Sequence, residues 1–102
     1  MKGYNNEYGY KLLKKNDTCI VVDESRKIGW NSKEMPKTVG EKVLVNRVYK
    51  EDCSASCNVK KTGEHWWYYT EDLRLFNRNI EKKRVTELVK SLIDKIKKIE
   101  SR

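Results

Sequence analysis

The chain has 102 residues, of which 37% are hydrophobic and 37% are charged. This length gives room for one domain with one small hydrophobic core, and it excludes a second core beside it. Lysine and arginine number 23 against 15 aspartates and glutamates, a formal net charge of +8. This charge permits a polyanionic partner, but many basic proteins have none.

Residues 1–9 are polar and aromatic, and we predict that they form an N-terminal arm. They lack the apolar core of a secretion signal. No run in the chain approaches the roughly 18 apolar residues that a membrane span needs. Three cysteines, an odd number, also argue against the paired disulfides of a secreted domain. We therefore expect a cytoplasmic protein without a membrane contact.

Residues 10–78 contain short strand patterns separated by turn signals. In the strongest pattern, 42–49, the apolar alternation slips at Asn46-Arg47, which predicts a β-bulge that helps the sheet to curl. Residues 53–57 are predicted as a turn, and residues 23–40 as a long loop, a feature that is usually functional in so small a domain. Five to six short strands predict a mainly β, barrel-like domain. The predicted strands are 10–13, 18–22, 42–49, 58–61, 66–70 and 73–76.

Residues 79–102 change to a helical pattern and predict a basic, amphipathic C-terminal helix. Its apolar stripe can dock on its own barrel, pair with a second copy or bind a partner. A heptad counted from Val85 would place Lys95 at a core position, which argues against a coiled coil. The opposite face carries lysines separated by acidic residues. We therefore interpret it mainly as a solvated face, and a phosphate-binding stripe is the second interpretation. The stripe consists of Val85, Leu88, Val89, Leu92, Ile96 and Ile99, with Ile93 on its edge.

A set of spaced residues gives the chain a resemblance to a known group. They are Asp17, Ile20, Val22, Gly29, Trp30, Asn31, Met35, Gly40, Val43, Val45, Val48, Trp67, Glu71, Asp72, Leu73 and Leu75. The sequence resembles small SH3-like proteins of bacteriophage and bacterial genomes, which are related in fold to the mind-bomb repeat. The resemblance covers about residues 10–76 and implies a small SH3-like barrel that binds or scaffolds without catalytic residues. It also implies that Trp67 points inward, which leaves Trp66 and Tyr68 outward.

Catalytic and metal-binding patterns are weak. His65 is the single histidine, and no nucleophile elbow or glycine-rich phosphate loop accompanies it. The paired carboxylates all fall in predicted turns. Cys53 and Cys57, which with His65 and Cys19 are the soft metal ligands of the chain, are separated by three residues where zinc knuckles favour two. We therefore predict no enzyme activity, no cofactor and no metal, and interpret Cys53 and Cys57 as a thiol pair across a hairpin.

The predicted function is a non-enzymatic protein-interaction module, a phage or mobile-element accessory protein that binds and modulates a host or phage protein in the host cytoplasm. The alternative is a nucleic-acid-binding protein whose aromatics stack on bases. We expect a monomer or a helix-mediated homodimer. A second interpretation of the outward aromatic side chains is that the N-terminal arm or the C-terminal helix covers them. The predicted partner-binding residues are Trp30, Asn31, Met35, Trp66 and Tyr68, and the alternative phosphate contacts are Lys60, Lys61, Arg74, Arg78, Lys83 and Lys90.

Overall fold

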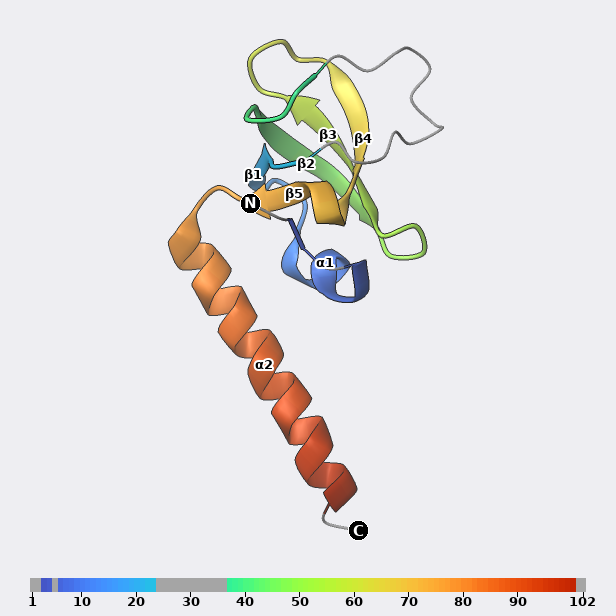
Figure 1. The fold of residues 1–102 in the computed structure, drawn as a ribbon, viewed down its shortest axis with the longest axis vertical. Helices are drawn as coiled ribbons and strands as arrows, with labels where there is room; N and C mark the ends of the chain where they lie inside the picture. The colour runs from blue at the N-terminus through green and yellow to red at the C-terminus, as the bar shows by residue number, and fades with distance from the viewer. Residues whose placement is uncertain (1–2, 5, 24–36, 101–102) are drawn as a thin grey trace.

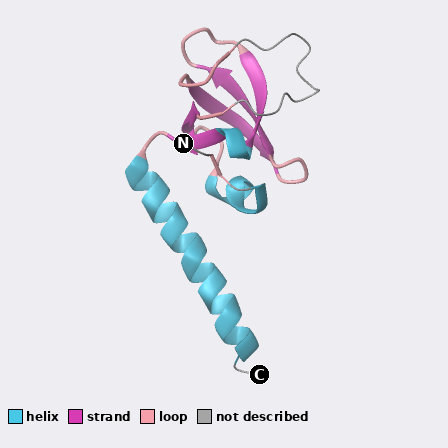
Figure 2. Ribbon diagram, viewed as in Figure 1, coloured by secondary structure: helices cyan, strands magenta, loops and turns pink. Residues whose placement is uncertain are grey.

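The computed structural model describes residues 3–4, 6–23 and 37–100, in which a small, strongly bent sheet carries a long C-terminal helix (Figures 1 and 2). A mainly β protein with a C-terminal helix was predicted, and this part of the prediction is confirmed. The elements are α1 (Asn6–Leu12), β1 (Thr18–Val21), β2 (Lys42–Tyr49), β3 (Ser54–Val59), β4 (His65–Tyr69), the 3₁₀ turn η1 (Thr70–Asp72), β5 (Leu73–Leu75) and α2 (Arg78–Glu100).

The five strands form one antiparallel, unclosed sheet in the order β4-β3-β2-β1-β5. The register of β2 against β3 shifts between Val45 and Arg47, so the bulge predicted near Asn46-Arg47 is confirmed. A bulge adds local twist, and the long strand β2 pairs with β1 on one side and with β3 on the other. β5 consequently lies on β1, opposite the β3–β4 hairpin.

Two predicted elements near the start of the chain and at the hairpin are wrong. Residues 10–13 are not a strand, because α1 runs through them to Leu12. Its buried residues Gly9 and Leu12, together with Leu13 directly after the helix, follow helical spacing, but a glycine hides this pattern in the sequence. A Cβ on Gly9 would lie 2.3 Å from the hydroxyl oxygen of Thr70, so glycine permits α1 to approach η1 closely. Residues 54–57 belong to β3 and not to a turn, since the sheet overrides the weak strand propensity of serine.

The inward face of the sheet forms the hydrophobic core, and it contains Trp66 and Tyr68. The prediction that these two side chains point outward is therefore wrong, and Trp67 and Tyr69 are the half-exposed pair. Trp66 and Tyr68 pair with Cys57 and Ala55 of β3, whose small side chains leave room for large rings. The remaining core residues are Leu13, Cys19, Val21, Val43, Val45, Val59, Leu73 and Leu75, with Tyr4 and Val48 packed against them.

Helix α2 begins one residue before the predicted start and extends far beyond the sheet (Figure 1). The side-chain oxygen of Asn77 accepts hydrogen bonds from the backbone N–H groups of Asn79 and Ile80, so the helix has the N-cap that asparagine favours. The molecule measures 53 Å along its longest axis and 28 Å along the next. Among the described residues, no helix combines the length and the apolarity of a membrane-spanning segment.

Candidate functional site

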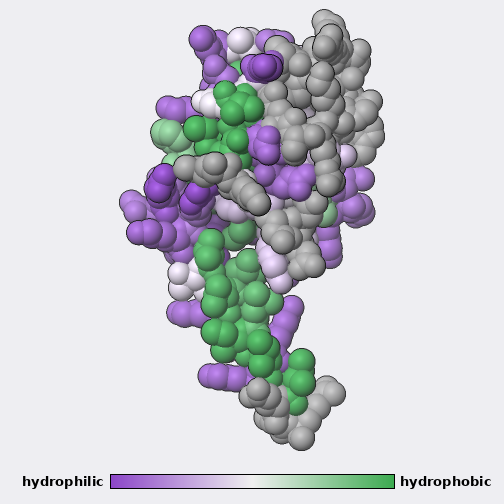
Figure 3. Space-filling view, in the orientation of Figure 1, coloured by the Kyte–Doolittle hydropathy of each residue, from purple (hydrophilic) through white to green (hydrophobic). Residues whose placement is uncertain are grey.

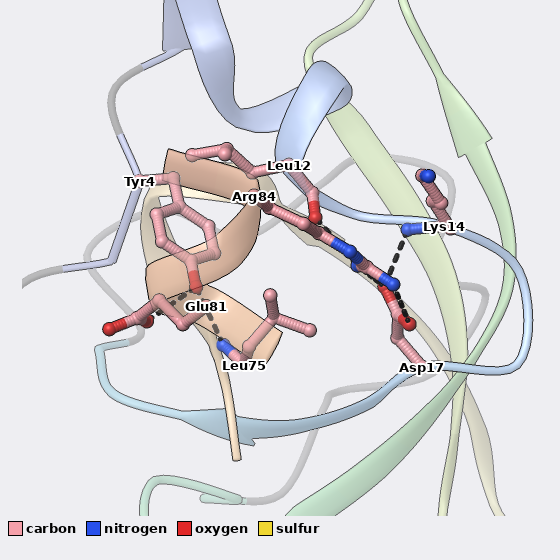
Figure 4. Close-up of polar contacts among 7 residues, drawn as sticks. All are labelled: Tyr4, Leu12, Lys14, Asp17, Leu75, Glu81 and Arg84. Atoms are coloured by element: carbon pink, nitrogen blue, oxygen red, sulfur yellow. Dashed lines mark hydrogen bonds and ion pairs between the residues drawn. The ribbon is translucent and has the colours of Figure 1, made fainter. Parts of the chain in front are cut away.

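The first anchor of α2 on the sheet domain is Arg84 (Figure 4). Its guanidinium donates to both carboxylate oxygens of Asp17, at 2.5 and 3.0 Å, and to the backbone oxygen of Leu12 at 2.8 Å. Asp17 also accepts a hydrogen bond from the backbone N–H of Lys14 at 2.6 Å. The hydrogen bond to Asp17 raises the pKa of Arg84. This bidentate pair joins α2 to the end of α1 and to the start of β1.

A second anchor lies nearly one helical turn earlier, at Glu81 (Figure 4). Arg74 of β5 donates to both oxygens of Glu81, at 2.9 and 2.8 Å. The hydroxyl of Tyr4 donates to Glu81 at 2.6 Å and accepts from the backbone N–H of Leu75 at 2.9 Å. Burial, followed by the hydrogen bond to Glu81, raises the pKa of Tyr4. The N-terminal segment, β5 and α2 therefore meet at one carboxylate, which fixes the first turn of the helix.

The Glu81 anchor predicts a loss of stability in acid. The hydrogen bonds from Arg74 and, less strongly, from Tyr4 hold the pKa of Glu81 below its ordinary value of 4.5. A carboxylate with a lowered pKa contributes stability that is complete above the ordinary pKa and is lost as the pH falls through the lowered one. The wild type should therefore be more stable than Glu81→Gln at pH 7, and the difference should shrink below about pH 4.5. Urea unfolding of both proteins between pH 7 and pH 3 measures it, and a constant difference would contradict the assignment.

Beyond its two anchors, α2 presents an exposed apolar face. The exposed fractions of Val85, Val89, Ile93, Ile96 and Ile99 lie between 39% and 72%, and Figure 3 shows these side chains as a green stripe along the helix. Of the three interpretations of the stripe, docking on its own domain is limited to the first two turns. Pairing with a second copy and binding a partner stay open for the rest.

A second surface lies on the outer face of the sheet, around Phe76. Strand pairing places Ile20 between Arg74 of β5 and Lys42 of β2. The backbone N–H of Lys60 donates to the backbone oxygen of Lys42, which brings the two lysines to neighbouring strands. Phe76 is 49% exposed, and the ammonium of Lys42 lies 4.2 Å from the centre of its ring. Phe76 borders two hollows, of about 370 and 150 Å³.

The predicted site residues are only partly brought together. Trp30, Asn31 and Met35 lie outside the described residues. Of the predicted phosphate contacts, Lys60, Arg74 and Arg78 line the hollows beside Phe76 and Lys61 follows Lys60, whereas Lys83 and Lys90 lie further along α2. Sequence reasoning missed Phe76 as the aromatic of this surface. Its signal was the alternation with the inward residues Leu73 and Leu75, which turns Phe76 outward.

The cysteines and the histidine do not converge. Cys57 is buried on the inner face of β3, whereas His65 is exposed and makes an edge-on contact with the ring of Trp67. Cys53 precedes β3 on the same side of the hairpin, so the predicted thiol pair across the hairpin is wrong. Burial raises the pKa of Cys19 to about 12 and raises that of Cys57 as well, so both thiols stay protonated near neutral pH. Among the described residues, no three His, Cys, Asp or Glu side chains are grouped to hold a metal ion.

The candidate site thus consists of two surfaces, the apolar face of α2 and the basic, aromatic outer face of the sheet around Phe76. The anchors at Glu81 and Arg84 hold the first two turns of α2 against the sheet domain, and the apolar face continues along the helix beyond them. In comparisons with known proteins, no family model matches the sequence, and no curated protein matches it.

Proposed function

We propose that the protein is a non-enzymatic protein-interaction module that binds a helical partner through α2. The observation that carries this proposal is the exposed apolar face of the helix. Monomeric soluble proteins rarely expose contiguous apolar surface of this kind, and when they do it usually marks an interaction site. Because the first two turns are fixed by Glu81 and Arg84, the rest of the helix is held out in a defined direction.

The spacing of the apolar residues specifies the kind of partner. Val85, Val89, Leu92, Ile96 and Ile99 are separated by four, three, four and three residues, the spacing of a helix whose seam packs against another helix. In this register Lys95 moves from a core position to the edge of the seam, so it no longer argues against helix pairing. Lys95 borders the seam, and Lys82 continues the same spacing at its N-terminal end; both would attract acidic residues. The partner is therefore an amphipathic helix with acidic edges.

The sheet domain serves in this proposal as the rigid base of α2. The bulge in β2, the 3₁₀ turn before β5 and the return of β5 to β1 support a small SH3-like barrel. The resemblance to SH3-like proteins of bacteriophages and bacteria supports an accessory protein that modulates a host or phage protein in the cytoplasm.

The apolar face can be tested by a double substitution that keeps the helix. Val89→Gln with Ile96→Gln should abolish capture of the partner from a nuclease-treated lysate, because two core positions of the seam become polar while glutamine favours a helix. The matched control, Lys90→Gln with Lys97→Gln, introduces the same residues on the opposite face and should bind like the wild type. The measurement is an affinity pull-down, with helix content checked by circular dichroism.

Two results would contradict this function. Equal capture by both double variants would show that the apolar face does not bind the partner. Sedimentation analysis tests whether a second copy of the chain occupies the seam. A stable dimer of the purified wild type that is lost in the Val89/Ile96 variant would assign the face to a second copy.

A further inference from the structure

Two lysines on the outer face of the sheet lie side by side without a compensating acid. Lys42 and Lys60 line the larger hollow, and their backbones are joined by a hydrogen bond at 3.0 Å. Among the described residues, neither side chain is within ion-pair distance of a carboxylate. Asp17 also lines the hollow, but its charge is paired with Arg84. Like charges on neighbouring strands destabilise a sheet, so this pair leaves a positive potential that an anion would neutralise.

The larger hollow joins this charge to an aromatic surface. Half of Phe76 is exposed at its border, and the ammonium of Lys42 lies near the ring. Asn16, Thr18 and Asn77 also line the hollow and offer amide and hydroxyl groups. An anion with an attached flat ring would therefore find a charge, a stacking surface and polar groups within one concavity.

A second basic hollow lies on the other border of Phe76. It is lined by Ile20, Arg74, Leu75, Phe76 and Arg78. Arg74 is bound to Glu81, whereas Arg78 is exposed at the start of α2. The exposed ring thus borders two hollows, and in the described part of the chain each of them contains a cation without an ion pair to a carboxylate, although the charge of Arg78 also helps to lower the pKa of Glu81.

We propose that this surface binds single-stranded nucleic acid, with a base stacked on Phe76. The phosphate on one side of that base contacts Lys42 and Lys60, and the phosphate on the other side contacts Arg78. This arrangement combines a basic track with an aromatic platform, which is how proteins bind single strands without reading their sequence. The site is separate from the apolar face of α2 and does not depend on the function proposed for it.

The geometry favours a single strand over other anionic ligands. A base in a duplex is stacked on its neighbours and cannot lie on the ring of Phe76. A free nucleotide would occupy one hollow, whereas a strand reaches the cations of both. An acidic peptide would meet the lysines but would not use the ring.

The test is a fluorescence anisotropy titration of the full chain with a labelled 12-nucleotide oligothymidylate at several salt concentrations. Lys42→Gln with Lys60→Gln should lower the affinity and reduce the salt slope by about 0.7 for each lost phosphate contact. Phe76→Leu, which keeps an apolar side chain but removes the ring, should weaken binding by about 10-fold. The control, Lys83→Gln with Lys90→Gln, has the same net charge as the first variant and should change the affinity less than two-fold.

Each other outcome overturns the proposal. Equal losses of affinity in the two lysine variants, or full affinity of Phe76→Leu, would show that the oligonucleotide binds only through the net charge of the protein. Thymidine monophosphate competing as well as the unlabelled oligonucleotide would assign the surface to a free nucleotide. Equal affinity for the matched duplex would show that the surface does not select a single strand. Equal affinity for polyglutamate, with the same dependence on Lys42 and Lys60, would assign the surface to an acidic peptide. Tryptophan fluorescence confirms that each variant is folded.

Discussion

Trp66→Ala should destabilise the protein by about 3–5 kcal/mol, the cost of removing a large aromatic side chain from a core. Trp66 is 6% exposed and packs on the inner face of the sheet beside Cys57. Small domains have a total stability of about 5–15 kcal/mol, so the variant should be marginally folded. Urea unfolding followed by far-ultraviolet circular dichroism measures the change without depending on tryptophan fluorescence.

The adjacent tryptophan supplies the matched control. Trp67 lies on the outer face, where its ring makes an edge-on contact with His65 at 4.5 Å between ring centres. Trp67→Ala should therefore cost only about 0.5–1.5 kcal/mol, the contribution of an aromatic pair. If Trp66→Ala does not fold, Trp66→Phe keeps part of the buried ring and still allows the comparison. A larger loss for Trp67→Ala would place Trp67 in the core, as the family resemblance implies.

This pair of tryptophans also shows where sequence reasoning reaches its limit. The alternation of strand side chains puts Trp66 and Trp67 on opposite faces, but it does not say which face is the core. That choice depends on the register of β4 with β3, which places Trp66 and Tyr68 opposite Cys57 and Ala55. The bulge in β2 and the C-terminal helix were predictable, because each changes a local period that extends over several residues.

The two candidate surfaces differ in the same way. The apolar face of α2 is readable from sequence, since its residues follow one helical period. The surface around Phe76 is readable only in part: Lys60, Arg74 and Arg78 were predicted as phosphate contacts, but Lys42 and the ring of Phe76 join them only through strand pairing. The anchor at Glu81 also depends on the fold, since Tyr4 contacts it from 77 residues away.

Arg84→Met should lower the free energy of unfolding by about 2–4 kcal/mol, because it breaks a mostly buried ion pair and leaves the carboxylate of Asp17 without its main partner. The exposed side-chain fractions of Arg84 and Asp17 are 17% and 11%, so solvent screens the pair only weakly. Arg78→Met, on the exposed side of the same helix, should change the stability by less than about 0.5 kcal/mol. Urea unfolding of both variants provides the comparison.

A double-mutant cycle with Asp17→Asn separates the ion pair from the packing of the arginine side chain. The combined variant, Arg84→Met with Asp17→Asn, should lose about 1–3 kcal/mol less than the sum of the single losses, because the second substitution removes a charge that is already unpaired. Additive losses would mean that the two side chains act independently. Coupling would establish Arg84 as the link that holds α2 to α1 and β1, and hence as the residue that sets the direction in which the apolar face of α2 is presented.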